Sequence, residues 1–180
     1  MVYVMLAQGF EEIEALAVVD ILRRGEVEVK TVSITDEKKV CGAHGITVES
    51  DVIIGDITDD FEALILPGGM PGTLNLQACK RLEQMILEAN KKQKLLGAIC
   101  AAPMVLGELG LLNEKEGTCY PSFEAHLLGC RFKEDRVCIS GNIITSRGAG
   151  TAHDFAFAIL KILKNEEISF DVRKSMLYDA

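Results

Sequence analysis

Short apolar runs alternate with segments of helical periodicity along most of the chain, and this alternation constrains the fold more than any other feature. Runs typical of strands lie at residues 2–7, 27–34, 63–66, 95–99, 136–140 and 143–146. Helical periodicity is found at residues 10–24, 74–92 and 103–109, and in a last segment that ends near residue 163. Such alternation predicts an α/β fold, in which right-handed crossovers build a mainly parallel sheet with helices on both faces.

The size of the chain fits one such sheet with one core. The chain has 180 residues, of which 48% are hydrophobic, so we expect a single domain over residues 1–180. A small hairpin is predicted where residues 40–41 and 46–48 flank a Gly-Ala-His-Gly turn. The last dozen residues carry no clear pattern and are left unassigned. No repeat, linker or low-complexity segment interrupts the chain.

Charge and targeting signals exclude several partners. The net charge of -8 and the isoelectric point near 4.9 argue against nucleic acid, which requires a concentrated basic surface. Residues 95–112 are nearly free of charge, but Glu108, Pro103 and several glycines favour a buried strand and helix over a membrane span. The first apolar run is too short, and lacks the preceding basic residues, for a signal peptide, so we expect a cytoplasmic protein.

The cysteines and histidines do not form a metal-binding pattern. Six cysteines are present, and without a secretory signal we expect them to be reduced thiols. There is no Cys-x-x-Cys pair, and the three histidines are scattered. The sequence therefore predicts no metal site.

Four loops follow the carboxyl ends of predicted strands, where ligands bind in sheets of this kind. Each loop carries glycine or a side chain that can react: residues 8–9, residues 68–69, Cys100, and residues 147–148. These loops are expected to meet at one edge of the sheet.

Cys100 has the sequence context of a nucleophile. It stands between the strand at residues 95–99 and a predicted helix, with the small neighbours Ala98, Ala101 and Ala102. Small residues permit a sharp strand-to-helix turn, and the amides at a helix start favour the thiolate. A buried structural thiol is the alternative, because free cysteine is among the most buried residue types.

Glu14 is the candidate partner for this thiol. Acidic residues are favoured in the first turn of a helix, so Glu11 and Glu12 are explained by a solvated helix start without any function. Glu14 is flanked by apolar residues and is harder to explain in this way. A carboxyl buried beside a cysteine can hold a shared proton. Gly68 and Gly69 form either a simple tight turn or part of an oxyanion site.

The residues that carry this chemistry resemble the ThiJ/PfpI superfamily, and within it the branch of the parkinsonism-associated protein deglycase. Four motifs occur in family order along nearly the whole chain: GFEEIE at 9–14, LPGG at 66–69, AICAAP at 98–103 and TSRGAGT at 145–151. The resemblance implies a flavodoxin-like three-layer sandwich, a homodimer and no cofactor.

The resemblance also assigns roles to particular residues. It implies Cys100 as the nucleophile, Glu14 as its proton-sharing partner, and the amides of Gly69 and Ala101 as an oxyanion site. Arg24 matches a family arginine that reaches the pocket of the partner subunit.

Three positions depart from patterns in the family. Tyr120 stands where some relatives have histidine before proline, so a histidine relay at that position is not expected. His44 stands where the deglycase branch often has arginine; it either lines the pocket or is solvated in the hairpin turn, and we favour the second. Ala101 replaces the histidine of the intracellular-protease branch, which disfavours proteolysis.

Two functions from different classes follow from the resemblance. The first is a glyoxalase or protein deglycase, in which Cys100 adds to small reactive 2-oxoaldehydes such as methylglyoxal. The second is a redox-sensing stress protein or chaperone, in which Cys100 is oxidised to the sulfinic acid. Motifs alone do not separate the two functions.

Overall fold

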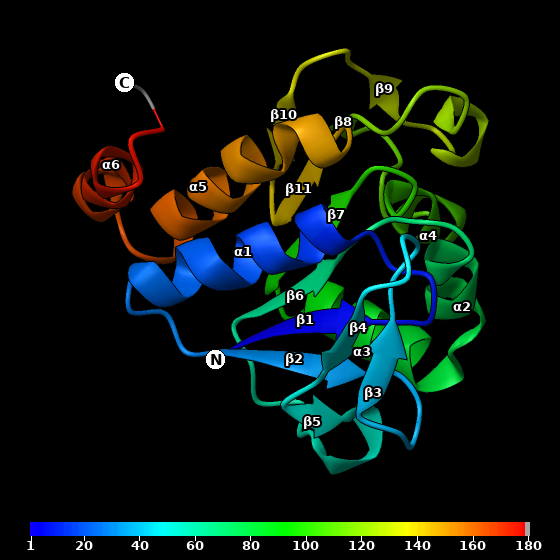
Figure 1. The fold of residues 1–180 in the computed structure, drawn as a ribbon. Coiled ribbons are helices and arrows are strands. Elements are labelled where there is room, and N and C mark those ends of the chain that lie inside the picture. The colour runs from blue at the N-terminus through cyan, green and yellow to red at the C-terminus, as the bar shows by residue number, and fades with distance from the viewer. Residues whose placement is uncertain (179–180) are drawn as a thin grey trace.

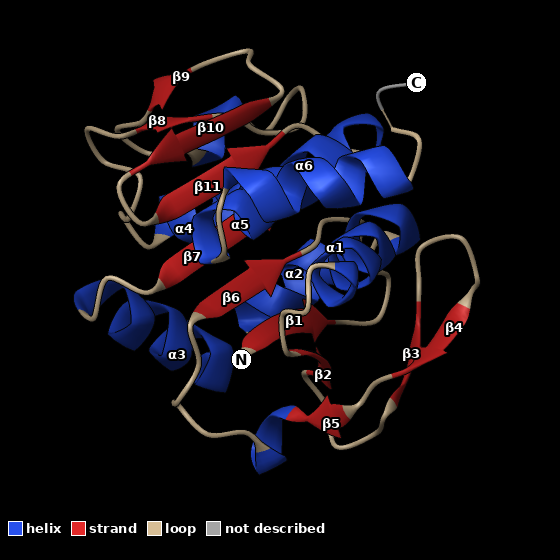
Figure 2. Cartoon of the chain, turned by 90° about the vertical axis from the view of Figure 1, so that its left-hand side faces the viewer, coloured by secondary structure: helices blue, strands red, loops and turns tan. Residues whose placement is uncertain are grey.

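A seven-stranded sheet lies between two layers of helices in the computed structural model, which describes residues 1–178 (Figures 1 and 2). The sheet has the order β10-β11-β7-β6-β1-β2-β5. Its strands are β1 (Val2–Leu6), β2 (Val29–Ser33), β5 (Val52–Ile53), β6 (Ala63–Leu66), β7 (Leu95–Ile99), β10 (Val137–Ser140) and β11 (Ile143–Ser146). Every neighbouring pair is parallel except β10 with β11. The predicted α/β fold with a mainly parallel sheet is confirmed.

Helices cover both faces of this sheet. One layer consists of α1 (Glu12–Arg24) and α5 (Ala152–Leu163), with α6 (Glu166–Ser175) packed on α5, and the other of α2 (Gly72–Ala78), α3 (Lys80–Lys91) and α4 (Pro103–Glu108). Three short 3-10 turns are η1 (Ile54–Asp56), η2 (Glu124–His126) and η3 (Ala149–Thr151). Two small sheets pair β3 (Lys39–Cys41) with β4 (Thr47–Glu49) and β8 (Glu116–Gly117) with β9 (Arg131–Phe132).

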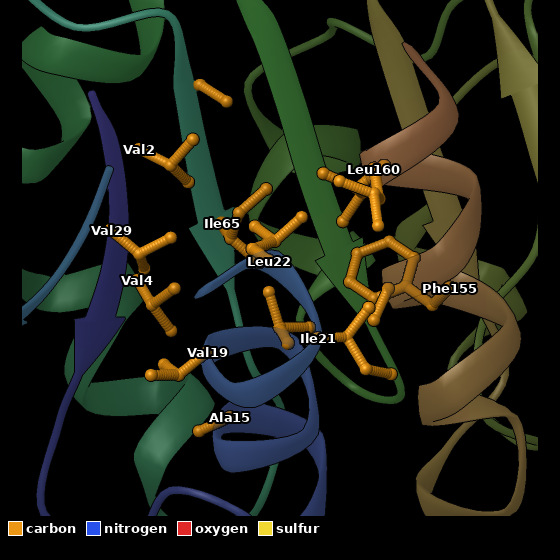
Figure 3. Close-up of a cluster of buried hydrophobic side chains, with 14 of the residues drawn as sticks. Val2, Val4, Ala15, Val19, Ile21, Leu22, Val29, Ile65, Phe155 and Leu160 are labelled. Atoms are coloured by element: carbon orange, nitrogen blue, oxygen red, sulfur yellow. The ribbon is translucent and has the colours of Figure 1, made fainter. Parts of the chain in front are cut away.

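The continuous apolar character of β1 follows from burial on both of its faces. Val2 and Val4 point into the core beneath α1 and α5, whereas Tyr3 and Met5 point into the core beneath α2, α3 and α4. A strand buried on both sides has no solvent-facing position and shows no polar alternation. Figure 3 shows the first of these cores, in which Phe155 of α5 packs beside α1.

The predicted single helix over residues 74–92 is wrong, because the structure contains two helices there. Cys79 has extended backbone dihedral angles and lies at the end of α2 and the start of α3. Leu76 and Leu82 on either side of the break are both buried in the same core. The change of helix direction lets both segments bury an apolar face, and continuous periodicity does not reveal it.

The other predicted elements are close to the observed ones. The hairpin is present as β3 and β4, and α1 ends at Gly25 as expected. This helix begins at Glu12 and not at Phe10, because Phe10 forms an isolated bridge with Gly42. The unassigned tail contains most of α6, which begins just before it and which Asn165 caps by accepting a hydrogen bond from the Ile168 amide. None of the described helices is long and apolar enough to cross a membrane.

The strand order brings the four candidate loops together. Strands β1, β6, β7 and β11 are consecutive neighbours in the sheet and run parallel. The loops that follow them therefore leave the same edge, as expected for a binding site in a parallel sheet.

The substitution Phe155→Ala tests how much the packing between α1 and α5 contributes to the free energy of unfolding. The Phe155 ring is fully buried, so Phe155→Ala is expected to lower the free energy of unfolding by about 3–5 kcal/mol. Phe170→Ala on α6 is the matched control, because the Phe170 side chain is 58% exposed and its loss should change stability by less than about 0.5 kcal/mol. Urea unfolding followed by circular dichroism measures both, and equal losses would contradict this account of the core.

Candidate active site

Cys100 lies directly after β7 in a sharp turn. Its φ angle of 64° is in the left-handed region, which non-glycine residues rarely adopt. Two backbone hydrogen bonds hold it there: its amide donates to the Ser146 carbonyl at 3.0 Å, and its own carbonyl accepts from the Tyr120 amide at 2.8 Å. Strained backbone of this kind is typical of functional turns, so the geometry is that of a nucleophile elbow.

Two glycines let the end of β6 approach this turn. A Cβ atom at Gly68 would lie 2.6 Å from Cys100 Cβ and 2.8 Å from Glu14 Oε2, so a side chain here would displace both groups. Gly69 has a φ angle of 89°, and a Cβ there would lie 2.5 Å from the Glu11 amide nitrogen. The glycines of this loop are therefore required for the close contact between α1, β6 and the elbow.

Glu14 is buried inside that contact. The residue is 1% exposed, and its Oε2 accepts a hydrogen bond of 2.8 Å from the Gly68 amide. Its Oε1 is buried, and none of the described residues 1–178 donates a hydrogen bond to it. Burial, assisted by the negative charge of Glu11, raises the pKa of Glu14 to about 7. Near neutral pH, Glu14 is therefore able both to hold and to release a proton.

Cys100 and Glu14 control each other's charge. Burial, followed by the charge of Glu14 and a hydrogen bond with it, raises the pKa of Cys100 to about 12. Hydrogen bonds from the amides of Ala101 and Gly69 lower this pKa but do not outweigh the other causes. These amides favour the thiolate, as expected from the sequence, but the helix start alone does not produce it. Between about pH 7 and 12 the pair carries one proton and one negative charge, so a thiolate forms when Glu14 holds that proton.

Glu11 and Glu12 are both buried, so the expected solvated helix start is wrong. The Glu11 carboxylate caps α1 by accepting a hydrogen bond of 2.7 Å from the Glu14 amide. The Glu12 carboxylate accepts 2.8 Å bonds from the amide and the ring Nδ1 of His44, so it holds the hairpin turn. Burial alone would raise the pKa of Glu12, but its hydrogen bonds from His44 lower it on balance.

This acidic cluster also has the spacing of a metal site. Potential ligand atoms of Glu11, Glu12 and His44 all lie within 4.8 Å of one another. Both oxygens of Glu12 already accept hydrogen bonds from His44. We therefore interpret the three residues as a hydrogen-bonded cluster that joins α1 to the hairpin.

A cavity of about 510 Å³ opens above the elbow and gathers most of the predicted residues. It is lined by Glu11, Glu12, Ile13, Glu14, His44, Ile46, Cys100, Tyr120 and Ala149. Cys100, Glu14, Tyr120 and His44 thus share one cavity, although His44 is also 69% exposed at its mouth. Sequence reasoning missed Ile13, Ile46 and Ala149, because no motif distinguishes a cavity wall from an ordinary exposed apolar residue.

The loop that carries Ala149 is held by one hydroxyl. Thr151 Oγ1 accepts hydrogen bonds from the amides of Arg147 and Gly148 and lies 2.7 Å from Ser146 Oγ. These bonds fix the turn after β11 against the elbow. The TSRGAGT motif therefore builds one wall of the cavity.

Arg24 does not line the cavity of its own chain. It lies at the far end of α1, where its Nε donates a 2.7 Å hydrogen bond to Asp20. Its predicted role in the pocket of a partner subunit stays a prediction.

Cys119, which precedes Tyr120, is fully buried, and burial raises its pKa to about 12.

Comparisons with known proteins agree with this arrangement. The model of the DJ-1/PfpI family matches residues 1–162. Protein DJ-1 homolog B of Arabidopsis thaliana is 40% identical over 174 residues, which are 95% of this chain. The glutathione-independent glyoxalase DJR-1.2 of Caenorhabditis elegans is 35% identical over 160 residues, covering 87% of this chain and 84% of that protein.

The structural similarity extends over the same length. The solved structure of oxidized Toxoplasma gondii DJ-1 matches with a TM-score of 0.94 and 34% identity, covering 98% of this chain and 97% of that one. The chain spans only 40% and 46% of the lengths of the Arabidopsis homologs B and A. The matches confirm the resemblance drawn from the four motifs and show that the chain belongs to the DJ-1/PfpI family.

Proposed function

We propose that the chain is a cofactor-independent, cysteine-dependent enzyme that converts small 2-oxoaldehydes such as methylglyoxal into 2-hydroxy acids, or acts on their protein adducts as a deglycase. The observation that carries this proposal is the buried pair of Cys100 and Glu14, which holds a single proton at the base of an open cavity. A relative named as a glutathione-independent glyoxalase supports the same chemistry.

The pair can carry out addition to an aldehyde without a separate acid. The Cys100 thiolate attacks the aldehyde carbon and forms a C–S bond, while the proton held by Glu14 passes to the carbonyl oxygen. The amides of Gly69 and Ala101 already donate to the sulfur, so they lie beside the oxygen of the resulting hemithioacetal. The products of this step are a neutral adduct and an ionised Glu14.

Glu14 then has the position of a proton shuttle. Its carboxylate takes the proton from the former aldehyde carbon, and the electron pair of that C–H bond forms an enediolate, whose negatively charged oxygen then accepts the proton of the adjacent hydroxyl. Return of the proton to the neighbouring carbon gives a hydroxyacyl thioester on Cys100. The unpartnered Oε1 supports this role, because a buried oxygen without a hydrogen bond is free to exchange a proton with a bound substrate.

A second candidate function is retained because the same amides also suit an oxidised sulfur. Ala101 and Gly69 would donate to the oxygen atoms of a Cys100 sulfinic acid, and the structural relative from Toxoplasma gondii is described as oxidized. In this alternative the chain is a redox-sensing stress protein or chaperone. A cytoplasmic location suits either function, since the six cysteines are free thiols.

We also propose a homodimer formed through the exposed face of α1. Ile13 and Leu16 are large exposed apolar residues on this face, and Ile46 on the neighbouring hairpin is 55% exposed. Arg24 lies on the same side of the helix, about 16 Å further along at 1.5 Å per residue. If a two-fold axis packs α1 against its copy in antiparallel fashion, Arg24 of one subunit approaches the cavity of the other.

Removal of the nucleophile tests the enzyme directly. Wild-type protein is expected to form lactate from methylglyoxal, and Cys100→Ser to reduce this to the level of buffer alone, because the hydroxyl cannot form the thioester. Cys79→Ser is the matched control, since this cysteine lies between α2 and α3 and outside the cavity. Product is identified by mass spectrometry; no lactate above buffer from wild-type protein would refute the glyoxalase proposal.

Glu14→Gln separates turnover from oxidation. The amide cannot shuttle a proton, so lactate formation is expected to fall about 10²- to 10⁴-fold. Cys100 should remain oxidisable by peroxide, because the substitution removes the negative charge that raises the pKa of the thiol. Intact mass after peroxide treatment measures oxidation, with Glu83→Gln as the surface control. Unchanged lactate formation would exclude Glu14 as the shuttle.

Ile13→Glu tests the proposed dimer. A charge buried in the proposed α1 interface is expected to convert a dimer into a monomer in sedimentation velocity. Ile162→Glu places the same charge on an exposed apolar position of α5 and should leave the dimer intact. A wild-type monomer, or a dimer that survives Ile13→Glu, would contradict this interface.

A further inference from the structure

The cavity contains one imidazole, and the steps above leave it without a role. His44 is the one histidine among the residues that line the cavity of Cys100. It lies on the hairpin turn between β3 and β4, opposite the start of α1. Its ring thus lines the same cavity as Cys100 and is also in contact with solvent.

Glu12 fixes this imidazole in one orientation. One carboxylate oxygen accepts the His44 backbone amide at 2.8 Å, and the other lies 2.8 Å from ring Nδ1. Glu12 is 5% exposed, so its carboxylate has little freedom to turn away. When the ring is neutral, the Nδ1 proton donates to Glu12 and the lone pair is left on Nε2. A carboxylate that orients an imidazole in this way is the arrangement of a general base.

The proposed reaction needs such a base after the thioester has formed. The acyl group on Cys100 is released only when water adds to the carbonyl carbon and loses a proton. Glu14 lines the same cavity but is 1% exposed, whereas the His44 side chain is 69% exposed at the mouth, where water enters. At roughly 30 Å³ per water molecule, a cavity of about 510 Å³ holds the acyl group and several waters together.

We propose that His44, oriented by Glu12, is the general base that activates water for hydrolysis of the acyl-Cys100 thioester. This inference rests on the proposed glyoxalase function. His44 Nε2 takes a proton from water, the hydroxide oxygen bonds to the acyl carbon, and the C–S bond breaks to release the Cys100 thiolate. The acid proton of the product returns to Glu14, and the proton on His44 passes to solvent, so the pair regains its starting state.

Two substitutions of His44 separate a base from a positive charge. His44→Gln removes the base, and His44→Arg supplies a permanent cation that cannot accept a proton. Both variants are expected to consume one equivalent of methylglyoxal at the wild-type rate and then form lactate about 10²-fold more slowly. His126→Gln is the control, because His126 pairs with Glu108 away from the cavity.

The stalled intermediate identifies the blocked step. Intact mass spectrometry of both variants should show an adduct with the mass of one methylglyoxal on Cys100. A thioester persists after methylglyoxal is diluted away and is released by neutral hydroxylamine, whereas a hemithioacetal reverses on dilution.

Each other result counts against the inference. Wild-type lactate formation without an adduct in His44→Gln, full turnover by His44→Arg, or an adduct that reverses on dilution would each overturn the role of His44. Absence of lactate from wild-type protein would instead show that the glyoxalase function itself is wrong. The role of His44 would then be wrong as well. Lactate formation by wild-type protein thus distinguishes failure of the His44 role from failure of the glyoxalase function.

Discussion

The contact between the Glu14 carboxyl and the Cys100 thiol is the interaction on which the chemistry of this fold depends. Two groups that both ionise by losing a proton are buried side by side, and the charge of either one disfavours ionisation of the other. The pair therefore carries no more than one negative charge up to about pH 12. The reactivity of the pair depends on whether the negative charge lies on the Glu14 carboxylate or on the Cys100 sulfur. A bound substrate can shift the charge from one group to the other.

Much of the surrounding structure keeps these two groups together. Gly68, in the loop after β6, has no side chain, so both Glu14 and Cys100 can pack closely against it, and its amide donates a hydrogen bond to the carboxylate. The strained elbow presents the sulfur beyond the end of β7, at the edge where the loops of four parallel strands meet. Three acidic residues at the start of α1 have three separate tasks. Glu11 caps the helix, Glu12 holds the hairpin, and Glu14 contacts the thiol.

Local patterns in the sequence predicted the fold, because the strands and helices are encoded by neighbours in the chain, whereas the pairing of Glu14 with Cys100 came from the resemblance of four separate motifs. Strands such as β1 and β7 are buried on both faces and appear as unbroken apolar runs. The break between α2 and α3 depends on packing against the sheet. The apolar residues keep helical spacing on both sides of Cys79, so the sequence pattern did not reveal the break. The bonds between Glu12 and His44 join residues 32 positions apart, and burial of Glu12 arises only when the hairpin folds over α1.

Direct titration of Glu14 tests the central claim that the pair shares one proton. The side-chain carboxyl of Glu14 can be followed by carbon-13 NMR across the pH range in wild-type protein, with Glu14→Gln used to assign its signal. The account predicts that this carboxyl loses its proton near pH 7, well above the ordinary range for glutamate. Loss of the proton near pH 4.5 would show an independent carboxylate beside a neutral thiol, and would contradict the shared-proton site.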